Sequence, residues 1–221
     1  MSVAIRATAQ ALFIVLVLAG ILFGIAQRLD WLNAWLLIAI YVVFLTLALI
    51  WAPPALIEER SRVAPNTKGW DKIILILNGV LLLAFLGVAA LDAGRFRHEM
   101  PFVATAIGIV AAICSGAVIL STVTSNPYLS RVARIQDDRG QTVITTGPYR
   151  FVRHPMYSAL ILLMFAIALI LGSSLALIPA FVIGVLYVIR AALEDRMLRN
   201  ELAGYSEYAA RVRYRLIPGI W

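Results

Sequence analysis

The densest group of hydrogen-bonding side chains in this sequence lies in one short stretch, Gly147–Tyr157, which reads GPYRFVRHPMY. It contains two arginines, one histidine and two tyrosines directly before a long uncharged run. A linker needs no such density of polar groups, so we interpret the stretch as a candidate binding site. A second polar pair, Arg190 and Glu194, follows the uncharged run, and its spacing of four residues places both side chains on one face of a helix.

Each of these groups also has a simpler interpretation. Arg150 and Arg153 can bind the phosphates of anionic lipids, and His154 can hydrogen-bond to the backbone at the start of a helix. Arg190 and Glu194 can form a surface pair that contributes only about 0.3–0.5 kcal/mol. The convergence of all of them at one place favours a polar pocket at a membrane surface.

The composition indicates a protein that is surrounded by lipid. The chain has 221 residues, of which 62% are hydrophobic and 14% charged, whereas soluble domains carry about 25% charged residues. Its formal charge is +7, but the basic residues lie between apolar runs and not in one patch with aromatic residues. This distribution favours contact with membrane lipids and no binding of nucleic acid. One cysteine inside an apolar run and two histidines in distant segments also argue against a bound metal.

Five uncharged runs organise the chain. The first four each match one membrane crossing, because about 20 helical residues cover a hydrocarbon core of roughly 30 Å. The fifth has 34 residues and would form a helix of about 51 Å, so we expect a tight helical hairpin, or a tilted or partly re-entrant one. A turn is predicted at Gly172-Ser173-Ser174, with Ser174 as N-cap of the next helix and Pro179 as a kink. The runs cover residues 9–26, 31–51, 73–91, 102–123 and 156–189.

The distribution of basic residues supports six crossings. With six, 16 of the 19 lysines and arginines lie on one side of the membrane, whereas five crossings would put those from Arg190 onward on the opposite side. This asymmetry predicts that both termini and the two long loops face the cytoplasm. The helix after the hairpin is expected to continue beyond the membrane as far as Gly204. The first run, preceded by Arg6, also fits a cleavable signal peptide, but the equally apolar runs that follow favour a transmembrane helix.

The sequence therefore predicts an all-α, polytopic membrane protein of one domain, 1–221, with about six transmembrane helices, the last two forming the hairpin. The crossings contain no charged residue or histidine, and Asn78 is the most polar residue well inside one, which argues against proton-coupled transport. The loop Pro53–Lys72 is either a solvated interfacial connector or a cover over the site. Its polar and aromatic residues include Glu58, Glu59, Arg60, Arg62, Lys68, Trp70 and Asp71.

Two segments of the C-terminal half resemble one family of enzymes. The first comprises Ala133–Gln136, Asp138–Gly140 and the run TTGPYRFVRHPMYSA, and the second reads EDRMLRNELAGYSEYAARVRYRLIPGI. Together they are similar to the pattern of the isoprenylcysteine carboxyl methyltransferase and phospholipid methyltransferase superfamily of integral membrane enzymes. The resemblance covers about 126–220. Asp195 stands where the acidic pair commonly has a second glutamate, Gln141 at a frequent histidine and Ala159 at a frequent glycine.

This resemblance implies S-adenosylmethionine as the methyl donor and a lipophilic or lipidated acceptor that enters from the bilayer, such as the carboxylate of an isoprenylated cysteine. It divides the chain into four N-terminal transmembrane helices, residues 1–124, and a catalytic and cofactor-binding part, residues 125–221, whose site faces the cytoplasm from the cytoplasmic membrane. The family motif Arg-x-x-x-Glu, implicated in activity, falls on Arg190 and Glu194. The implied cofactor-binding residues are Tyr149, Arg150, Arg153, His154, Pro155, Tyr157, Glu194 and Asp195.

The implied chemistry agrees with the residue types. The carboxylate of S-adenosylmethionine suits arginine and a helix N-terminus, and its ammonium group suits Glu194. A carboxylate acceptor is already ionised at pH 7 and could be oriented by Arg190, whereas an amine acceptor would need Glu194 or Tyr149 as a base. Two other functions stay open. One is an NADPH-dependent membrane reductase, because sterol reductases are similar in C-terminal architecture, and the other is a non-catalytic lipid-binding protein.

Overall fold

The computed structural model describes residues 3–51, 53, 56–57, 59 and 66–221, and this part of the chain is helical without a β-strand, as predicted. A π-helical turn, η1 (Ala90–Arg95), extends one of the long helices, and two short 3-10 helices, η2 (Asp137–Arg139) and η3 (Gly147–Arg150), precede the fifth uncharged run. The α-helices are α1 (Val3–Ala26), α2 (Leu32–Trp51), α4 (Gly69–Ala89), α5 (Phe102–Ser125), α6 (Pro155–Leu171), α7 (Leu177–Glu201) and α8 (Tyr205–Arg211).

Five helices in the described part are long and apolar enough to cross a membrane, which is consistent with an integral membrane protein. They are α1, α2, α4 with its π-helical extension, α5 and α7. The remaining apolar helix, α6, has 17 residues and is shorter than a usual crossing. The polytopic all-helical architecture expected from the sequence is therefore confirmed, with α6 as its short member.

The hairpin predicted in the fifth uncharged run is formed by α6 and α7. Gly172 ends α6 in the left-handed conformation, with φ of +76°, which a residue without Cβ adopts at no steric cost. Two details of the prediction are wrong. The Oγ atom of Ser173, and not of Ser174, accepts a hydrogen bond from the N–H of Ala176 at 3.1 Å. Pro179 is the third residue of α7, where its missing N–H would be unpaired in any case, so α7 continues uninterrupted.

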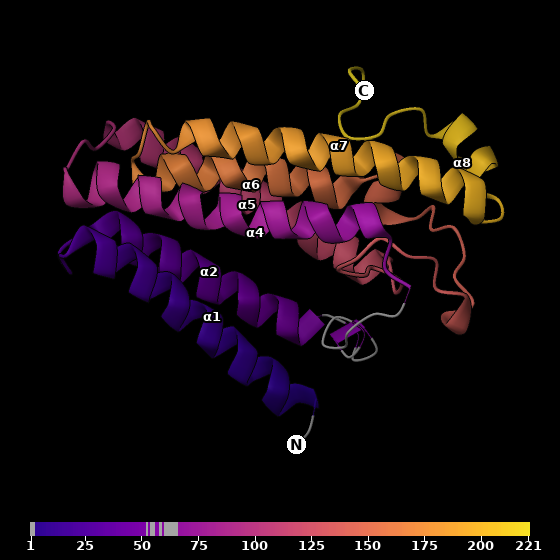
Figure 1. Cartoon of the computed structure of the whole chain (residues 1–221), viewed down its shortest axis with the longest axis horizontal. Helices are drawn as coiled ribbons and strands as arrows, with labels where there is room; N and C mark the ends of the chain where they lie inside the picture. Colours follow the sequence, from indigo (N-terminus) through magenta and orange to yellow (C-terminus); the bar gives the residue numbers. More distant parts are fainter. Residues whose placement is uncertain (1–2, 52, 54–55, 58, 60–65) are drawn as a thin grey trace.

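The helices form two groups, as Figure 1 shows. Helices α4, α5, α6 and α7 run alongside one another, and the α1–α2 pair diverges from them toward one end of the molecule (Figure 1). The long segment between α5 and α6, the end of α7 and α8 all lie at that end, whereas the turn between α6 and α7 lies at the other. The polar stretch Gly147–Tyr157 and the pair of Arg190 and Glu194 are thus brought to the same end of the molecule.

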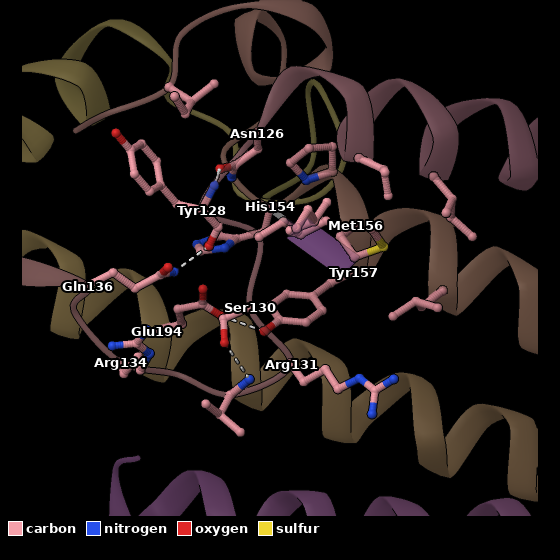
Figure 2. Close-up of a pocket in the computed structure, with 18 of the residues that line it drawn as sticks. Asn126, Tyr128, Ser130, Arg131, Arg134, Gln136, His154, Met156, Tyr157 and Glu194 are labelled. Carbon is pink, nitrogen blue, oxygen red and sulfur yellow. Dashed lines mark hydrogen bonds between the residues drawn. The ribbon is translucent and has the colours of Figure 1, made fainter. Parts of the chain in front are cut away.

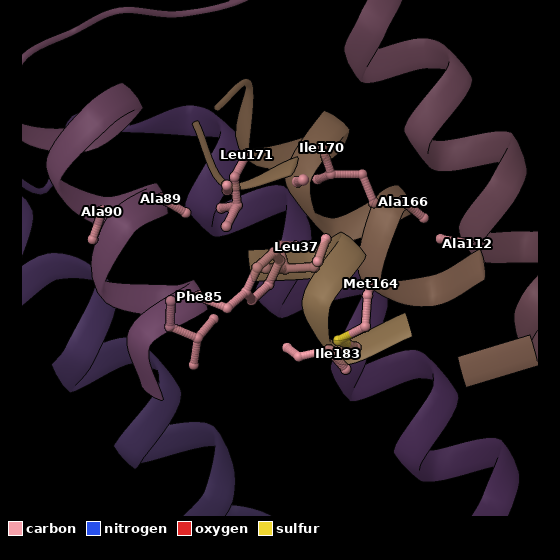
Figure 3. Packing of buried hydrophobic residues seen from close by; sticks show 14 of the residues in the cluster. Leu37, Phe85, Ala89, Ala90, Ala112, Met164, Ala166, Ile170, Leu171 and Ile183 are labelled. Atoms are coloured by element: carbon pink, nitrogen blue, oxygen red, sulfur yellow. The ribbon is translucent and has the colours of Figure 1, made fainter. Parts of the chain in front are cut away.

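Small residues allow the helices around α6 to approach closely. Alanines of α4, α5 and α6 pack with larger apolar side chains such as Phe85 and Ile183 (Figure 3). A Cβ atom added to Gly108 of α5 would come within 2.8 Å of the backbone oxygen of Ala166 in α6. The Oγ atom of Ser115 donates a hydrogen bond of 2.7 Å to the backbone oxygen of Ala159. These contacts fix α6 against α5, and so fix the position of the polar stretch that precedes α6.

Candidate functional site

The N-terminus of α6 lies against the C-terminal segment of the chain. His154 is the N-cap of α6 and Pro155 its first residue, as expected from the tolerance of this position for proline. The backbone N–H groups of Arg153 and His154 donate hydrogen bonds to the backbone oxygens of Tyr214 and Arg215, at 3.0 and 2.9 Å. The C-terminal segment around Tyr214 and Arg215 therefore packs directly on the end of the polar stretch before α6.

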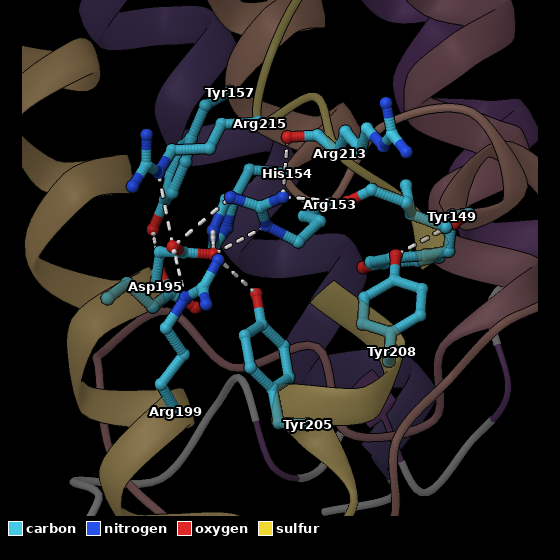
Figure 4. A network of polar contacts seen from close by, with 12 residues as sticks. Tyr149, Arg153, His154, Tyr157, Asp195, Arg199, Tyr205, Tyr208, Arg213 and Arg215 are labelled. Atoms are coloured by element: carbon cyan, nitrogen blue, oxygen red, sulfur yellow. Dashed lines mark hydrogen bonds and ion pairs between the residues drawn. The ribbon is translucent and has the colours of Figure 1, made fainter. Parts of the chain in front are cut away.

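Asp195 of α7 is the centre of an ion network beside this junction (Figure 4). Its side chain is 1% exposed and binds the guanidinium group of Arg153, with the shorter contact at 2.6 Å. Arg199 and Arg215 each donate from Nε at 3.1 Å, and the hydroxyl of Tyr205 donates at 3.0 Å. One buried carboxylate thus joins α7, the start of α6, the C-terminal segment and α8.

Glu194, the residue before Asp195 on α7, and Arg190, one turn before Glu194, meet an aromatic stack. The hydroxyl of Tyr157 donates a hydrogen bond to Oε2 of Glu194. The ring of Tyr157 stacks between those of His154 and Tyr187, at centroid distances of 5.8 and 5.7 Å. The Arg190 guanidinium lies 5.4 Å from the centroid of the Tyr157 ring, a cation–π contact. The two helices of the hairpin therefore bring both sequence-predicted groups together around Tyr157.

Asp71 of α4 holds Arg190, and the sequence did not identify this partner. The Asp71 side chain is fully buried and accepts hydrogen bonds from Nε and Nη2 of Arg190 at 2.8 and 3.1 Å. It also accepts one from the backbone N–H of Ala133 at 2.7 Å, and Nη2 of Arg190 donates to the backbone oxygen of Arg131 at 2.8 Å. Asp71 thereby connects α4, α7 and the segment between α5 and α6.

The region predicted as the loop Pro53–Lys72 contacts the C-terminal half of the chain through its described residues. Lys68 binds Glu201 at 2.8 Å, and the buried guanidinium of Arg134 binds Glu59, also at 2.8 Å. Three other residues named in this loop, Glu58, Arg60 and Arg62, lie outside the described residues. The described part of the loop is thus tied to the α5–α6 connection and to α7.

Residues 126–144, which we call the roof segment, cover the polar groups at the start of α6. Nε2 of Gln136 donates to the backbone oxygen of Tyr128 at 2.5 Å, and Oε1 of Gln141 accepts from the N–H of Gln136 at 2.8 Å. Arg134 binds Asp138 at 2.9 Å, and this hydrogen bond raises the pKa of Arg134 and lowers that of Asp138. The roof segment is therefore held by its own side chains as well as by Asp71.

A cavity of about 700 Å³ lies beneath the roof segment (Figure 2). Its volume is within the range of roughly 300–1,000 Å³ that is usual for small-molecule sites. One part, the polar lobe, is lined by Asn126, Gln136, Tyr149, His154, Tyr157, Arg190 and Glu194. The other part, the apolar lobe, is lined by side chains of α1, α2, α4 and α5 that include Ile14, Leu45, Leu49, Leu75, Ile119 and Val123.

Most of the sequence-predicted site residues line this cavity, and two do not. Arg150 is exposed, and Asp195 is buried within its ion network; neither lines the cavity. The predicted residues that do line it are Tyr149, Arg153, His154, Pro155, Tyr157, Arg190 and Glu194. Lining residues that sequence reasoning missed include Asn126, Tyr128 and Gln136, which lie in the segment of family resemblance but carry no spacing that marks them.

The charges around the cavity are unevenly compensated. Arg153, Arg134 and Arg190 each have a carboxylate partner. Glu194 is the acidic residue among the described lining residues, and within the described part of the chain its hydrogen-bonding partner is the hydroxyl of Tyr157, not a cation. The Glu194 carboxylate can therefore accept a hydrogen bond from a cationic group of a ligand, although Arg131 and Arg190 also line the cavity.

Tyr149 lies in the polar lobe as a neutral phenol. Its hydroxyl accepts a hydrogen bond of 2.7 Å from Nδ2 of Asn126, and its backbone oxygen accepts one of 2.7 Å from the hydroxyl of Tyr208. Burial raises the pKa of Tyr149 above its usual value of about 10. Its hydroxyl is therefore protonated at neutral pH and is a poor base for an amine acceptor.

Comparison with known families identifies one matching family model. Residues 103–203 match the model of the phospholipid methyltransferase family, which belongs to the isoprenylcysteine carboxyl methyltransferase-like membrane superfamily. The match runs from the start of α5 to just beyond α7 and includes His154, Tyr157, Arg190 and Glu194. A search of curated proteins found no match. The family resemblance seen in the sequence is confirmed, and it indicates a membrane methyltransferase that acts on lipid-like substrates.

Proposed function

Starting from the phospholipid methyltransferase segment at residues 103–203, we propose that this protein transfers a methyl group from S-adenosylmethionine to a lipid-like acceptor. The observation that carries the proposal is the continuity of the cavity, which joins a polar lobe that contains the Glu194 carboxylate to an apolar lobe between membrane-type helices. A charged, water-soluble cofactor fits the first lobe and a lipid tail fits the second. A purely soluble or purely lipidic ligand would leave one lobe without a partner.

S-adenosylmethionine is a reasonable ligand for the polar lobe. Glu194 offers a carboxylate to the ammonium group of its methionine part, with the Tyr157 hydroxyl as its described hydrogen-bond partner. Nε2 of His154 is buried, 3.6 Å from Oδ1 of Asp195 and without a hydrogen-bond partner in the described part of the chain. The imidazole lines the cavity and lies between it and the ion network of Asp195. When bound, this cofactor supplies an electrophilic methyl group on a sulfonium sulfur.

The remaining work of the protein is to position the acceptor and to exclude water. We assign Arg190, fixed between Asp71 and the ring of Tyr157, to orient the acceptor head group at the junction of the two lobes. For an amine acceptor, Glu194 is the preferred base, because Tyr149 holds its proton. We assign Asp195 and Arg153 to hold the start of α6 and the C-terminal segment around the cofactor.

The proposal also assigns an organisation to the chain. Residues 1–124 provide four N-terminal membrane helices and much of the apolar lobe, and residues 125–221 provide the cofactor site within one domain. We assign the end of the molecule that carries α8 to the cytoplasm, because 16 of the 19 basic residues belong to the segments expected on that side. S-adenosylmethionine is produced there.

Calorimetric titration of the protein in detergent with S-adenosylmethionine tests the cofactor assignment. We expect saturable binding by the wild type and a loss of at least about tenfold in affinity for Glu194→Gln, because a hydrogen bond to a charged group contributes about 1.5–3 kcal/mol. Glu207→Gln, which changes an exposed carboxylate of α8, is the matched control and should bind as the wild type does. A folded wild type that gives no heat with S-adenosylmethionine contradicts the proposal, and saturable heat with NADPH instead would favour the reductase.

A further inference from the structure

Asn78 is a polar side chain inside an apolar membrane span. It lies in α4, in the span Gly69–Arg95, seven residues beyond Asp71. At 1.5 Å per residue this places it about 10 Å along the helix axis from the ion pair of Asp71 and Arg190. It lines the cavity together with apolar neighbours such as Leu75 and Leu45. Asn78 therefore belongs to the apolar lobe, away from the charged groups assigned to the cofactor.

The hydrogen-bonding capacity of Asn78 is only partly used. Its side chain lies beside Tyr187, whose ring stacks on that of Tyr157. Its Oδ1 atom is buried and has no hydrogen-bond partner among the described residues. An unpaired polar atom is costly at membrane depth, because lipid tails offer it no hydrogen bond. A residue of this kind is stabilised when a ligand supplies the missing group.

We infer that Oδ1 of Asn78 accepts a hydrogen bond from a hydroxyl or amide N–H group of the lipid-like acceptor, and so selects the acceptor. This inference rests on the proposed function, which identifies the occupant of the apolar lobe as the acceptor. The required group must be a donor, since Oδ1 can only accept. This donor group must also lie deeper in the membrane than the acceptor's head group. Arg190, which is assigned to the head group, pairs with Asp71, and Asn78 is about two helical turns farther along α4. An acceptor with a pure hydrocarbon tail leaves Oδ1 unpaired and is bound less well.

Replacement of Asn78 by Leu, which has a similar volume and no polar atom, tests the inference. Wild-type and variant proteins are incubated with labelled S-adenosylmethionine and the total lipid extract of the expression host, and the methylated products are identified by mass spectrometry. We expect the KM for the methylated lipid to rise about tenfold, as for the loss of one buried hydrogen bond, with the affinity for S-adenosylmethionine and kcat within about twofold of the wild type. A product that carries a hydroxyl or amide N–H in its tail region is also expected.

Thr46→Val is the matched control, because it removes a hydroxyl from the membrane helix α2 that is already bonded to the backbone oxygen of Val42 and does not line the cavity. It should leave the KM unchanged. Asn78→Leu should unfold at the same temperature as the wild type or a higher one, because the unpaired oxygen is gone. If this variant fails to fold, Asn78→Ala replaces it in the same assay.

An unchanged KM for Asn78→Leu, or a product with no donor group below its head group, overturns the inference while leaving the proposed function intact. A wild type that binds S-adenosylmethionine but methylates nothing in the extract contradicts the proposed function instead. In that case the inference is tested by the amount of lipid that each purified protein retains, extracted and quantified by mass spectrometry. Retention that falls several-fold in Asn78→Leu and not in Thr46→Val supports it, and equal retention overturns it.

Discussion

Replacement of Asp71, in the first turn of α4, by Asn should destabilise the protein strongly. The Asp71 carboxylate accepts two hydrogen bonds from Arg190 and one from the backbone of Ala133. An asparagine side chain has one acceptor oxygen, so its NH2 group would face either Nε of Arg190 or the two donors that now share Oδ2, and at least one of the three hydrogen bonds is lost. The Arg190 side chain, which is 9% exposed, would keep its charge without a counterion.

The expected loss is about 3–5 kcal/mol, the usual cost of removing one partner of a buried ion pair. For a chain of this length, about 2–4 °C of melting temperature corresponds to each kcal/mol, so the midpoint should fall by roughly 6–20 °C. Thermal unfolding in detergent, followed by tryptophan fluorescence, measures this shift. Lys68→Ala is the control on the same helix end, and it should cost at most about 1 kcal/mol, because its pair with Glu201 is partly exposed.

The double variant Asp71→Leu with Arg190→Met separates stability from function. Replacement of both buried charges by apolar side chains of similar size should recover most of the lost stability. Methyl transfer should not recover, because the guanidinium assigned to the acceptor is gone. If Asp71→Asn unfolds within about 1 °C of the Lys68→Ala control, the pair of Asp71 and Arg190 does not stabilise the protein in the way that its burial indicates.

Three further changes have defined outcomes. Tyr157→Phe keeps the aromatic stack but removes the hydroxyl that binds Glu194, so transfer of labelled methyl groups should fall about tenfold; equal rates would show that this bond does not act in the reaction. Arg150→Ala should bind S-adenosylmethionine within about twofold of the wild type in calorimetry, since Arg150 is exposed outside the cavity, and a larger loss would assign it to the site. Burial, together with the neighbouring Asp195, raises the pKa of Tyr205, so its contribution to stability is complete below the usual tyrosine pKa of about 10 and is lost as pH rises further. Unfolding measured at about pH 8 and pH 11 should therefore show a smaller alkaline loss in Tyr205→Phe than in the wild type, and an equal loss would exclude Tyr205 as its source.

The sequence predicted the helices well, because membrane crossings are marked by long uncharged runs whose length is set by the bilayer. The hairpin followed from a run that was too long for one helix, and Gly172 ends α6 within the predicted turn. The choice between the hydroxyls of Ser173 and Ser174 as the acceptor in the turn before α7 could not be made in the same way. It depends on which hydroxyl faces the N–H of Ala176, and a local sequence does not specify that orientation.

The site was predicted where its residues are close in sequence or follow a helical spacing, and it was missed where they are far apart. His154 and Tyr157 share the start of α6, and Arg190 and Glu194 share one face of α7. No spacing connects Asp71 with Arg190, because their pairing depends on how α4 packs against α7. Arg150 is exposed whereas Arg153 is buried. This difference likewise depends on how η3 turns before α6.

The separation of Asp71 and Arg190 also has a consequence for biosynthesis. The two residues are 119 positions apart, and Asp71 lies 32 positions before the family-like segment begins. At about 5–20 residues per second, the ribosome adds Arg190 roughly 6–24 s after Asp71. During this interval Asp71 lacks the guanidinium partner that it has in the folded protein, so we expect the N-terminal end of α4 to stay near the membrane surface until Arg190 has been added. A nascent chain arrested before Arg190 should therefore keep the N-terminal end of α4 accessible to water-soluble labelling reagents, and a chain arrested after α7 should protect it.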